Sequence, residues 1–129
     1  MLLAAITPLK FGHEPGRWVT CDYAVRADLL QEILEALEVT PVRDAFADKE
    51  NKRFHKWYGE GSPDGTNAFE QNWGSEILWI NPSFNLFPQV LDKIVRHKAH
   101  AVIIVPFWRK KKFFMKAWGL AIAAIRVPT

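Results

Sequence analysis

The sequence predicts an α/β fold in which helices cover both faces of one sheet, giving three layers. Helix-like and strand-like apolar patterns alternate along the chain, which is typical of this class and not of all-α or all-β domains. A length of 129 residues corresponds to one domain, so residues 1–129 are expected to fold as a single unit. The composition, 49% hydrophobic with six Trp, two Tyr and nine Phe, is sufficient to fill a core without disulfides.

The first half of the chain is expected to supply an arm, a helix, a strand and a long loop. Residues 1–17 are interpreted as an N-terminal arm or strand. Leucine and isoleucine recur at helical spacing opposite acidic and amide side chains over Asp28–Glu38, which predicts an amphipathic helix. A short buried strand follows at Val42–Phe46. The stretch Asp48–Trp73 is rich in Gly, Asn and Asp and is expected to be mostly loop, with one short strand or turn near Ala68.

The second half is expected to supply three strands and one helix. Glu76–Ile80 reads as a strand, and Leu86–Lys98 carries one apolar stripe at helical spacing, with Asn85 as its cap. Ala99–Pro106 is a continuous apolar run of the kind that forms a strand buried on both faces. Leu120–Val127 is the last predicted strand. Ligands of such sheets bind beyond the carboxyl ends of the strands, so the segments that follow these strands are the first candidates for a site.

Composition also disfavours several kinds of site and location. The single cysteine, Cys21, cannot form an internal disulfide or a cysteine-rich zinc site and is interpreted as a buried residue. The four histidines are too scattered to suggest a metal site, so no metal is expected. No apolar run reaches the roughly 18 to 20 residues that cross a bilayer, and the opening residues lack the basic start of a secretion signal. The prediction is a cytoplasmic or nuclear protein that is not secreted and has no membrane partner.

Charge is distributed unevenly along the chain, although the net charge is only +3. Residues 1–92 hold all 14 acidic residues and 8 basic ones, whereas residues 93–129 hold 9 basic residues and no acidic one. Aromatic side chains beside cations are typical of surfaces that bind DNA or other nucleic acid. A solvated basic loop over an aromatic core explains the same pattern equally well. The candidate nucleic-acid contacts are Trp108, Arg109, Lys110, Lys111, Lys112 and Lys116.

The most specific motif follows the strand expected at 76–80 and reads Asn81-Pro82-Ser83-Phe84. It resembles the Asn/Asp-Pro-Pro-Tyr/Phe motif of amino-group DNA methyltransferases. The exocyclic nitrogen of adenine is a weak nucleophile because its lone pair is delocalised into the ring. The resemblance implies that the Asn81 side-chain oxygen and the Pro82 carbonyl accept the two N–H groups and localise that lone pair. Phe84 would then stack on a base that has left the duplex.

Other segments extend the likeness to the phage-type Dam adenine methyltransferase family. Asp44-Ala45-Phe46, with Asn51 seven residues after the acid, is similar to that family's first motif. Asn67 opens a segment, ending in Trp, that looks like the stretch before the family's catalytic strand. The strand ending at Pro106 and the aromatic residues after it are similar to the late strand. The closest likeness is to the Dam-like domain of DIRS-type and related retroelement polyproteins, over about residues 18–127.

This resemblance implies a compact Rossmann-like, methyltransferase-type three-layer sandwich of mobile-element or phage origin. The implied activity is methyl transfer from S-adenosylmethionine to the amino group of adenine in DNA. The implied cofactor-binding residues are Asp44, Ala45, Phe46, Asn51 and Asn67, and the implied catalytic residues are Asn81, Pro82, Ser83 and Phe84. Ser83 stands where the family has a second proline, and Asn67 stands where it has an acid. The alternative interpretation is a catalytically inactive remnant that acts as a nucleic-acid-binding module.

Overall fold

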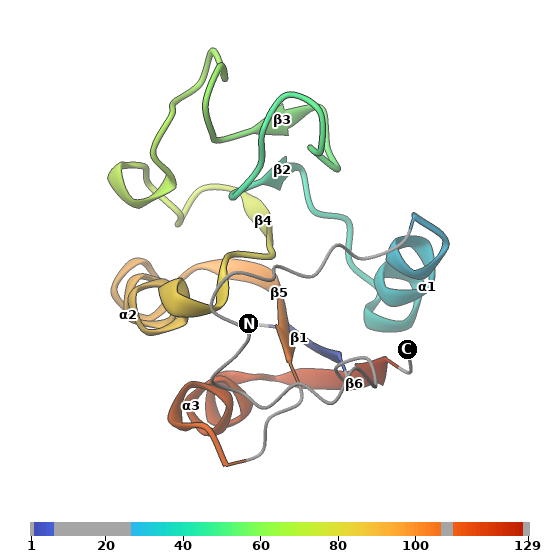
Figure 1. Cartoon of the computed structure of the whole chain (residues 1–129). Helices are drawn as coiled ribbons and strands as arrows, with labels where there is room; N and C mark the ends of the chain where they lie inside the picture. The colour runs from blue at the N-terminus through green and yellow to red at the C-terminus, as the bar shows by residue number, and fades with distance from the viewer. Residues whose placement is uncertain (1, 7–26, 107–109, 128–129) are drawn as a thin grey trace.

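The computed structural model describes residues 2–6, 27–106 and 110–127, and Figure 1 shows their arrangement. Strands and helices alternate along these residues, which confirms the α/β class predicted from the sequence. In chain order the elements are β1 (Leu2–Ile6), α1 (Ala27–Leu37), β2 (Arg43–Asp44), β3 (Lys56–Trp57), the short 3-10 helix η2 (Ala68–Glu70), β4 (Ile77–Ile80), the short 3-10 helix η3 (Phe84–Leu86), α2 (Phe87–His97), β5 (His100–Pro106), α3 (Lys112–Leu120) and β6 (Ala123–Val127).

The strands form one sheet in the order β3-β2-β4-β5-β1-β6, and each neighbouring pair is parallel. β1, the first strand in the sequence, lies between the last two strands, β5 and β6. Leu2 is in register with Val102 on one side and with Ala123 on the other. The strand interpretation of the N-terminus is therefore confirmed for residues 2–6, while the rest of the expected arm, residues 7–17, lies outside the described residues.

Helices cover both faces of the sheet, so the domain has three layers (Figure 1). On one face, the apolar stripe of α1 shares a buried cluster with Val102 and Ile104 of β5. On the opposite face, α2 and α3 lie over a larger cluster that includes Ile103 and Val105. β5 thus sends alternate side chains into two cores, as expected for a strand buried on both faces.

Most elements form where the sequence predicts them. α1 matches the helix expected over Asp28–Glu38, and α2 matches the one expected over Leu86–Lys98. β4 and β5 also match their predicted strands closely. The strand expected at Val42–Phe46 forms but has only two residues. The Ala45 N–H still donates to the Trp79 carbonyl of β4, but the backbone then bends, and the Phe46 N–H donates to the Asp44 side chain instead of to a neighbouring strand.

The start of α2 differs from the expectation. Asn85 is not its cap, because Leu86 occupies the N-cap position. No side-chain hydrogen bond caps the first turn of α2. The physical reason is that η3 leads directly into α2, so Asn85 already lies inside a helical turn. Pro88 sits in the first turn of α2, where a missing N–H removes no helical hydrogen bond.

Two elements are missing from the sequence-based prediction. Helix α3 occupies the basic segment, with Phe114 and Ala117 buried on its inner side. The surrounding lysines obscure this short apolar periodicity in the sequence. Because α3 continues to Leu120, β6 begins only at Ala123, later than expected. Strand β3 lies in the stretch expected to be loop and is too short to leave an alternating pattern.

Candidate functional site

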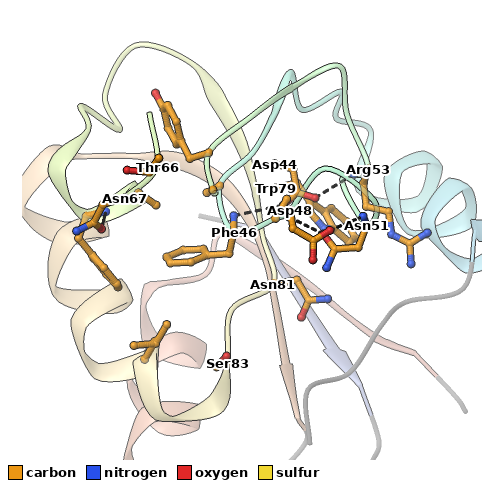
Figure 2. Close-up of a pocket in the computed structure, with 17 residues that line it drawn as sticks. Asp44, Phe46, Asp48, Asn51, Arg53, Thr66, Asn67, Trp79, Asn81 and Ser83 are labelled. Atoms are coloured by element: carbon orange, nitrogen blue, oxygen red, sulfur yellow. Dashed lines mark hydrogen bonds between the residues drawn. The ribbon is translucent and has the colours of Figure 1, made fainter. Parts of the chain in front are cut away.

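A cavity of about 620 Å³ lies at the carboxyl ends of β2 and β4 (Figure 2). From β2 the chain passes outward to β3, whereas β4 lies on the other side of β2, so the strand order reverses here. Open parallel sheets bind ligands at such a reversal, and ligand pockets usually measure roughly 300 to 1,000 Å³. We therefore assign this cavity as the candidate functional site.

Residues predicted from three separate segments come together in this cavity. Those that line it are Asp44, Ala45, Phe46, Asn51, Asn67, Asn81 and Ser83. Pro82, another member of the predicted set, is buried next to Asn81 and does not line the cavity, and Phe84 is the first residue of η3. A hydrogen bond from the Ala45 backbone N–H to the Trp79 carbonyl, 3.0 Å, holds the ends of β2 and β4 together and so brings the first two segments side by side.

Asp44 organises the loop that forms one side of the cavity. Its side chain is 3% exposed, with Oδ1 accepting the Phe46 backbone N–H at 3.3 Å and Oδ2 accepting the Arg53 backbone N–H at 3.0 Å. Burial raises the pKa of this carboxyl to about 6, although the two N–H donors and the Arg53 charge act in the opposite direction. Both oxygens of Asp44 are thus used to fold the 46–53 loop.

Asn51 and Asp48 fix a tight turn inside that loop. The Asp48 backbone N–H donates to Asn51 Oδ1 at 2.7 Å. In return, Asp48 Oδ1 accepts the backbone N–H groups of Glu50 and Asn51 at 2.9 and 2.8 Å. Both side chains are exposed at the cavity edge (Figure 2). Reciprocal side-chain to backbone bonds of this kind are typical of Asx turns, so the turn holds its shape without neighbouring secondary structure.

Aromatic rings form a second side of the cavity. Phe46 and Phe69 line it and meet edge to face, with ring centroids 5.3 Å apart. Trp73, which is fully buried, contacts both of these rings at 6.0 Å between centroids and donates its indole N–H to the Ala68 carbonyl at 2.9 Å. Asn67 leads into this side, and its Oδ1 accepts the Phe69 backbone N–H at 3.0 Å, so it caps η2. We call Phe46, Phe69 and Trp73 the aromatic wall.

A buried arginine fixes the loop on the third side. Arg43 is 7% exposed and binds Glu76 through two of its nitrogens and Asp64 through a third, at 2.9 Å. Its guanidinium also lies 4.4 Å from the centroid of the Tyr58 ring. Hydrogen bonding to Glu76 raises the pKa of Arg43, and the same bond lowers the pKa of Glu76. The loop that carries Asp64 is thereby attached to β2 and to the start of β4.

Several cavity residues were not singled out from the sequence. Tyr58, Gly59, Thr66 and Phe69 line the cavity from the stretch that was expected to be loop, where no periodic pattern shows which side chains face inward. Among these residues, the glycine at position 59 is the one whose residue type could have indicated a close contact between loops. Its φ is +153°, and a Cβ there would lie 1.7 Å from the Ala47 carbonyl oxygen, so only glycine lets these two loops meet.

The described part of the predicted nucleic-acid segment forms a basic surface just before α3 and along its first turns. This basic surface consists of Lys110, Lys111, Lys112 and Lys116, all exposed, and none of them lines the cavity. Because α3 begins shortly after the carboxyl end of β5, the neighbour of β4, its first turn belongs to the same edge of the sheet as the cavity. Trp118 on α3 is 55% exposed, whereas Phe114 is buried. Trp108 and Arg109 lie outside the described residues.

Among residues 2–6, 27–106 and 110–127, no group of three or more His, Cys, Asp or Glu is placed to hold a metal ion. None of the described helices has the combination of length and apolar character that crossing a membrane requires. Comparison of the chain with protein-family models, curated proteins and solved structures also finds no match.

Proposed function

We propose that this chain is an S-adenosylmethionine-dependent DNA adenine methyltransferase-like domain of the phage-type Dam family, with a Rossmann-like, methyltransferase-type sheet and an origin in a mobile element or phage. One observation carries the proposal. Asp44, Asn67 and Asn81 were selected by separate short motifs, and all three line one cavity at the point where the strand order reverses. A chance likeness of short motifs gives no reason for their residues to converge there.

The lining of the cavity suits S-adenosylmethionine. Phe46 and Phe69 offer aromatic surface to a flat adenine ring, while Asp48 and Asn51 offer acidic and amide groups to hydroxyl and ammonium groups. When bound, the cofactor supplies an electrophilic methyl group. Asp44 supports this site through the loop, because both of its carboxylate oxygens already accept backbone N–H groups.

Asn81 and Ser83 mark the substrate end of the cavity. The Asn81 amide oxygen and the Pro82 carbonyl would accept the two N–H groups of the adenine amino group and so direct its nitrogen lone pair toward the methyl group. The N–CH3 bond would form as the S–CH3 bond breaks, S-adenosylhomocysteine would leave, and the surplus amino proton would pass to solvent. The adenine must leave the duplex to reach this depth, and Phe84 stacks on it by its position in the motif. Orientation and exclusion of water then provide most of the rate enhancement, so no strong base is required.

The basic surface of α3 completes the proposal. Its four lysines lie on a segment with no acidic residue and start at the same sheet edge as Asn81. Phosphates that flank an extruded base carry the complementary charge, and neutralising them releases bound counterions. We therefore assign the basic surface to the DNA backbone on either side of the target adenine.

Two observations favour a second candidate, a catalytically inactive module that binds nucleic acid. Asn67, where the family has an acid, uses its side-chain oxygen to cap η2. Ser83, where the family has a second proline, leaves the backbone after Pro82 less constrained. Such a module keeps the basic surface and has lost the ability to use the cofactor.

Cofactor binding and methyl transfer test the proposal. Calorimetry with S-adenosylmethionine and S-adenosylhomocysteine should show binding to the parent chain, and labelled methyl groups should appear on adenine-containing DNA. Asn81→Ala should abolish transfer, while Asn85→Ala, an exposed asparagine outside the cavity, should leave it unchanged. Binding of DNA without binding of either cofactor form would establish the inactive module and exclude the enzyme.

A further inference from the structure

Helix α2 buries a lysine under the aromatic wall. Lys93 is 3% exposed, and its Nζ donates to the Phe69 backbone carbonyl at 2.9 Å. The same ammonium lies 5.3 Å from the centroid of the Trp73 ring. Burial lowers the pKa of Lys93, and the nearby Arg96 charge acts in the same direction. Burying a cation is unfavourable unless it gains hydrogen bonds, so the bond of Lys93 to the Phe69 carbonyl is needed to offset the cost of its burial.

His97 follows one helical turn after Lys93 and bonds the same segment. Its Nδ1 accepts the Trp73 backbone N–H at 3.1 Å, and its Nε2 lies 3.4 Å from Lys93 Nζ. The two side chains are therefore adjacent on α2, and each contacts a backbone group 24 residues earlier in the chain. We call Lys93 and His97 the α2 pair.

The segment that the α2 pair bonds has little regular structure of its own. Between Asn67 and β4 it contains only η2, a three-residue 3-10 helix, which is a weak element on its own. Yet this segment supplies Phe69 to the cavity and Trp73 behind it, with the two rings stacked at an interplanar angle of 29°. Phe46 then rests against both rings. The position of the aromatic wall thus depends on what holds this segment.

We propose that Lys93 and His97 are positioning residues that set the plane of the aromatic wall for a ligand with a flat heteroaromatic ring, such as an adenosyl group. The inference rests on the proposed function and adds the residues behind the wall that control affinity for that ring. Neither side chain lines the cavity, so both act through Phe69 and Trp73. Stacking contacts need the two ring planes to be held in place, and displacements near 1 Å are known to weaken a site severely.

Paired substitutions separate positioning from packing. Lys93→Met keeps the length of the side chain and removes the donor to Phe69, whereas Lys93→Arg keeps a donor. His97→Leu removes the acceptor for Trp73, whereas His97→Gln keeps one. Arg96→Met is the matched control, because it removes one exposed cation from the same helical turn and has no bond to the segment.

Two readouts are needed. Lys93→Met and His97→Leu should each weaken binding of adenosine and of S-adenosylhomocysteine by about the same factor, near tenfold, which corresponds to loss of one charge-assisted or buried hydrogen bond. Lys93→Arg, His97→Gln and Arg96→Met should stay within about twofold of the parent. In parallel, two-dimensional NMR should show the backbone amides of Phe46 and Phe69 shifting in the first two variants and not in the control.

The outcomes distinguish this inference from the proposed function. If the parent binds neither ligand, the proposed function fails, and the NMR shifts alone decide whether the α2 pair positions the wall. Unmoved Phe46 and Phe69 amides in both Lys93→Met and His97→Leu would overturn the inference. If the parent binds the ligands, an unchanged affinity in both variants would overturn it as well. If Lys93→Met does not fold, His97→Leu decides the question alone, because it retains the buried lysine.

Discussion

Asp44 and Arg53, nine residues apart, are joined by a 3.0 Å hydrogen bond between the Arg53 backbone N–H and Asp44 Oδ2. With the Phe46 N–H on its other oxygen, this buried carboxylate holds both ends of the loop that closes one side of the cavity. The motif resemblance predicts that Asp44 binds a cofactor, whereas its hydrogen bonds show that it holds the loop. Changes at Asp44 are therefore expected to affect stability as well as ligand binding.

The first prediction concerns pH. The pKa of Asp44 is raised from 3.8 to about 6, so the folded protein binds a proton more tightly than the unfolded chain. The folding free energy contributed by this proton is fully present below about pH 4 and is lost as the pH rises through 6, by up to about 3 kcal/mol at 1.36 kcal/mol per pKa unit. Urea unfolding between pH 4 and 7.5 should show this decline in the parent and not in Asp44→Asn. A parallel pH dependence in both proteins would contradict the assignment.

Ser83→Pro is the second prediction. Proline at this position restores the second proline of the family motif and should stiffen the backbone that aims the Pro82 carbonyl. Methyl transfer to adenine-containing DNA should therefore rise above that of the parent when measured with labelled cofactor. Ser83→Ala is the control, because it separates the loss of the serine hydroxyl from the gain of the proline ring. Equal transfer in the alanine and proline variants would argue against the motif.

The third prediction concerns the basic surface. Replacing Lys111 and Lys112 by Gln should weaken DNA binding for all sequences alike and reduce the salt slope by about 0.7 to 0.9 log units per lost phosphate contact. The matched control neutralises Arg96 and Lys98, two exposed cations at the end of α2. Fluorescence anisotropy at several salt concentrations measures both effects. If the two double variants behave alike, general charge explains the binding and α3 has no special role.

Two glycine variants form the fourth prediction. Gly59→Ala places a Cβ 1.7 Å from the Ala47 carbonyl at a φ of +153°, so the two loops must separate, with an expected loss of about 2 to 4 kcal/mol of stability. Gly119→Ala, in α3, meets no atom within 4 Å and should stabilise the helix by up to about 1 kcal/mol. Thermal unfolding of both variants tests the pair. A stable Gly59→Ala protein would mean that the two loops do not meet as described.

The sequence predicted the elements that leave a periodic pattern and missed those that do not. The stripe of α1 and the apolar run of β5 are long enough to identify, whereas β3 has two residues and α3 hides its buried Phe114 among lysines. The candidate site divides in the same way. Asn81 could be predicted because it belongs to a motif. The hydrogen bond from Lys93 to the Phe69 carbonyl, 24 residues earlier, depends on the tertiary fold and leaves no local pattern in the sequence.

The place of β1 has a consequence for how the chain reaches this fold. β6 pairs with the sheet through β1, and β1 in turn pairs with β5, about a hundred residues away in the sequence. On a ribosome, β1 is made about a hundred residues before β5, so this apolar segment must remain without its partner strand until β5 has been synthesised. Contacts this distant along the chain slow folding because a long loop must close first. Binding of residues 2–6 by a chaperone during synthesis would protect β1, the strand that joins β6 to β5 in the described sheet.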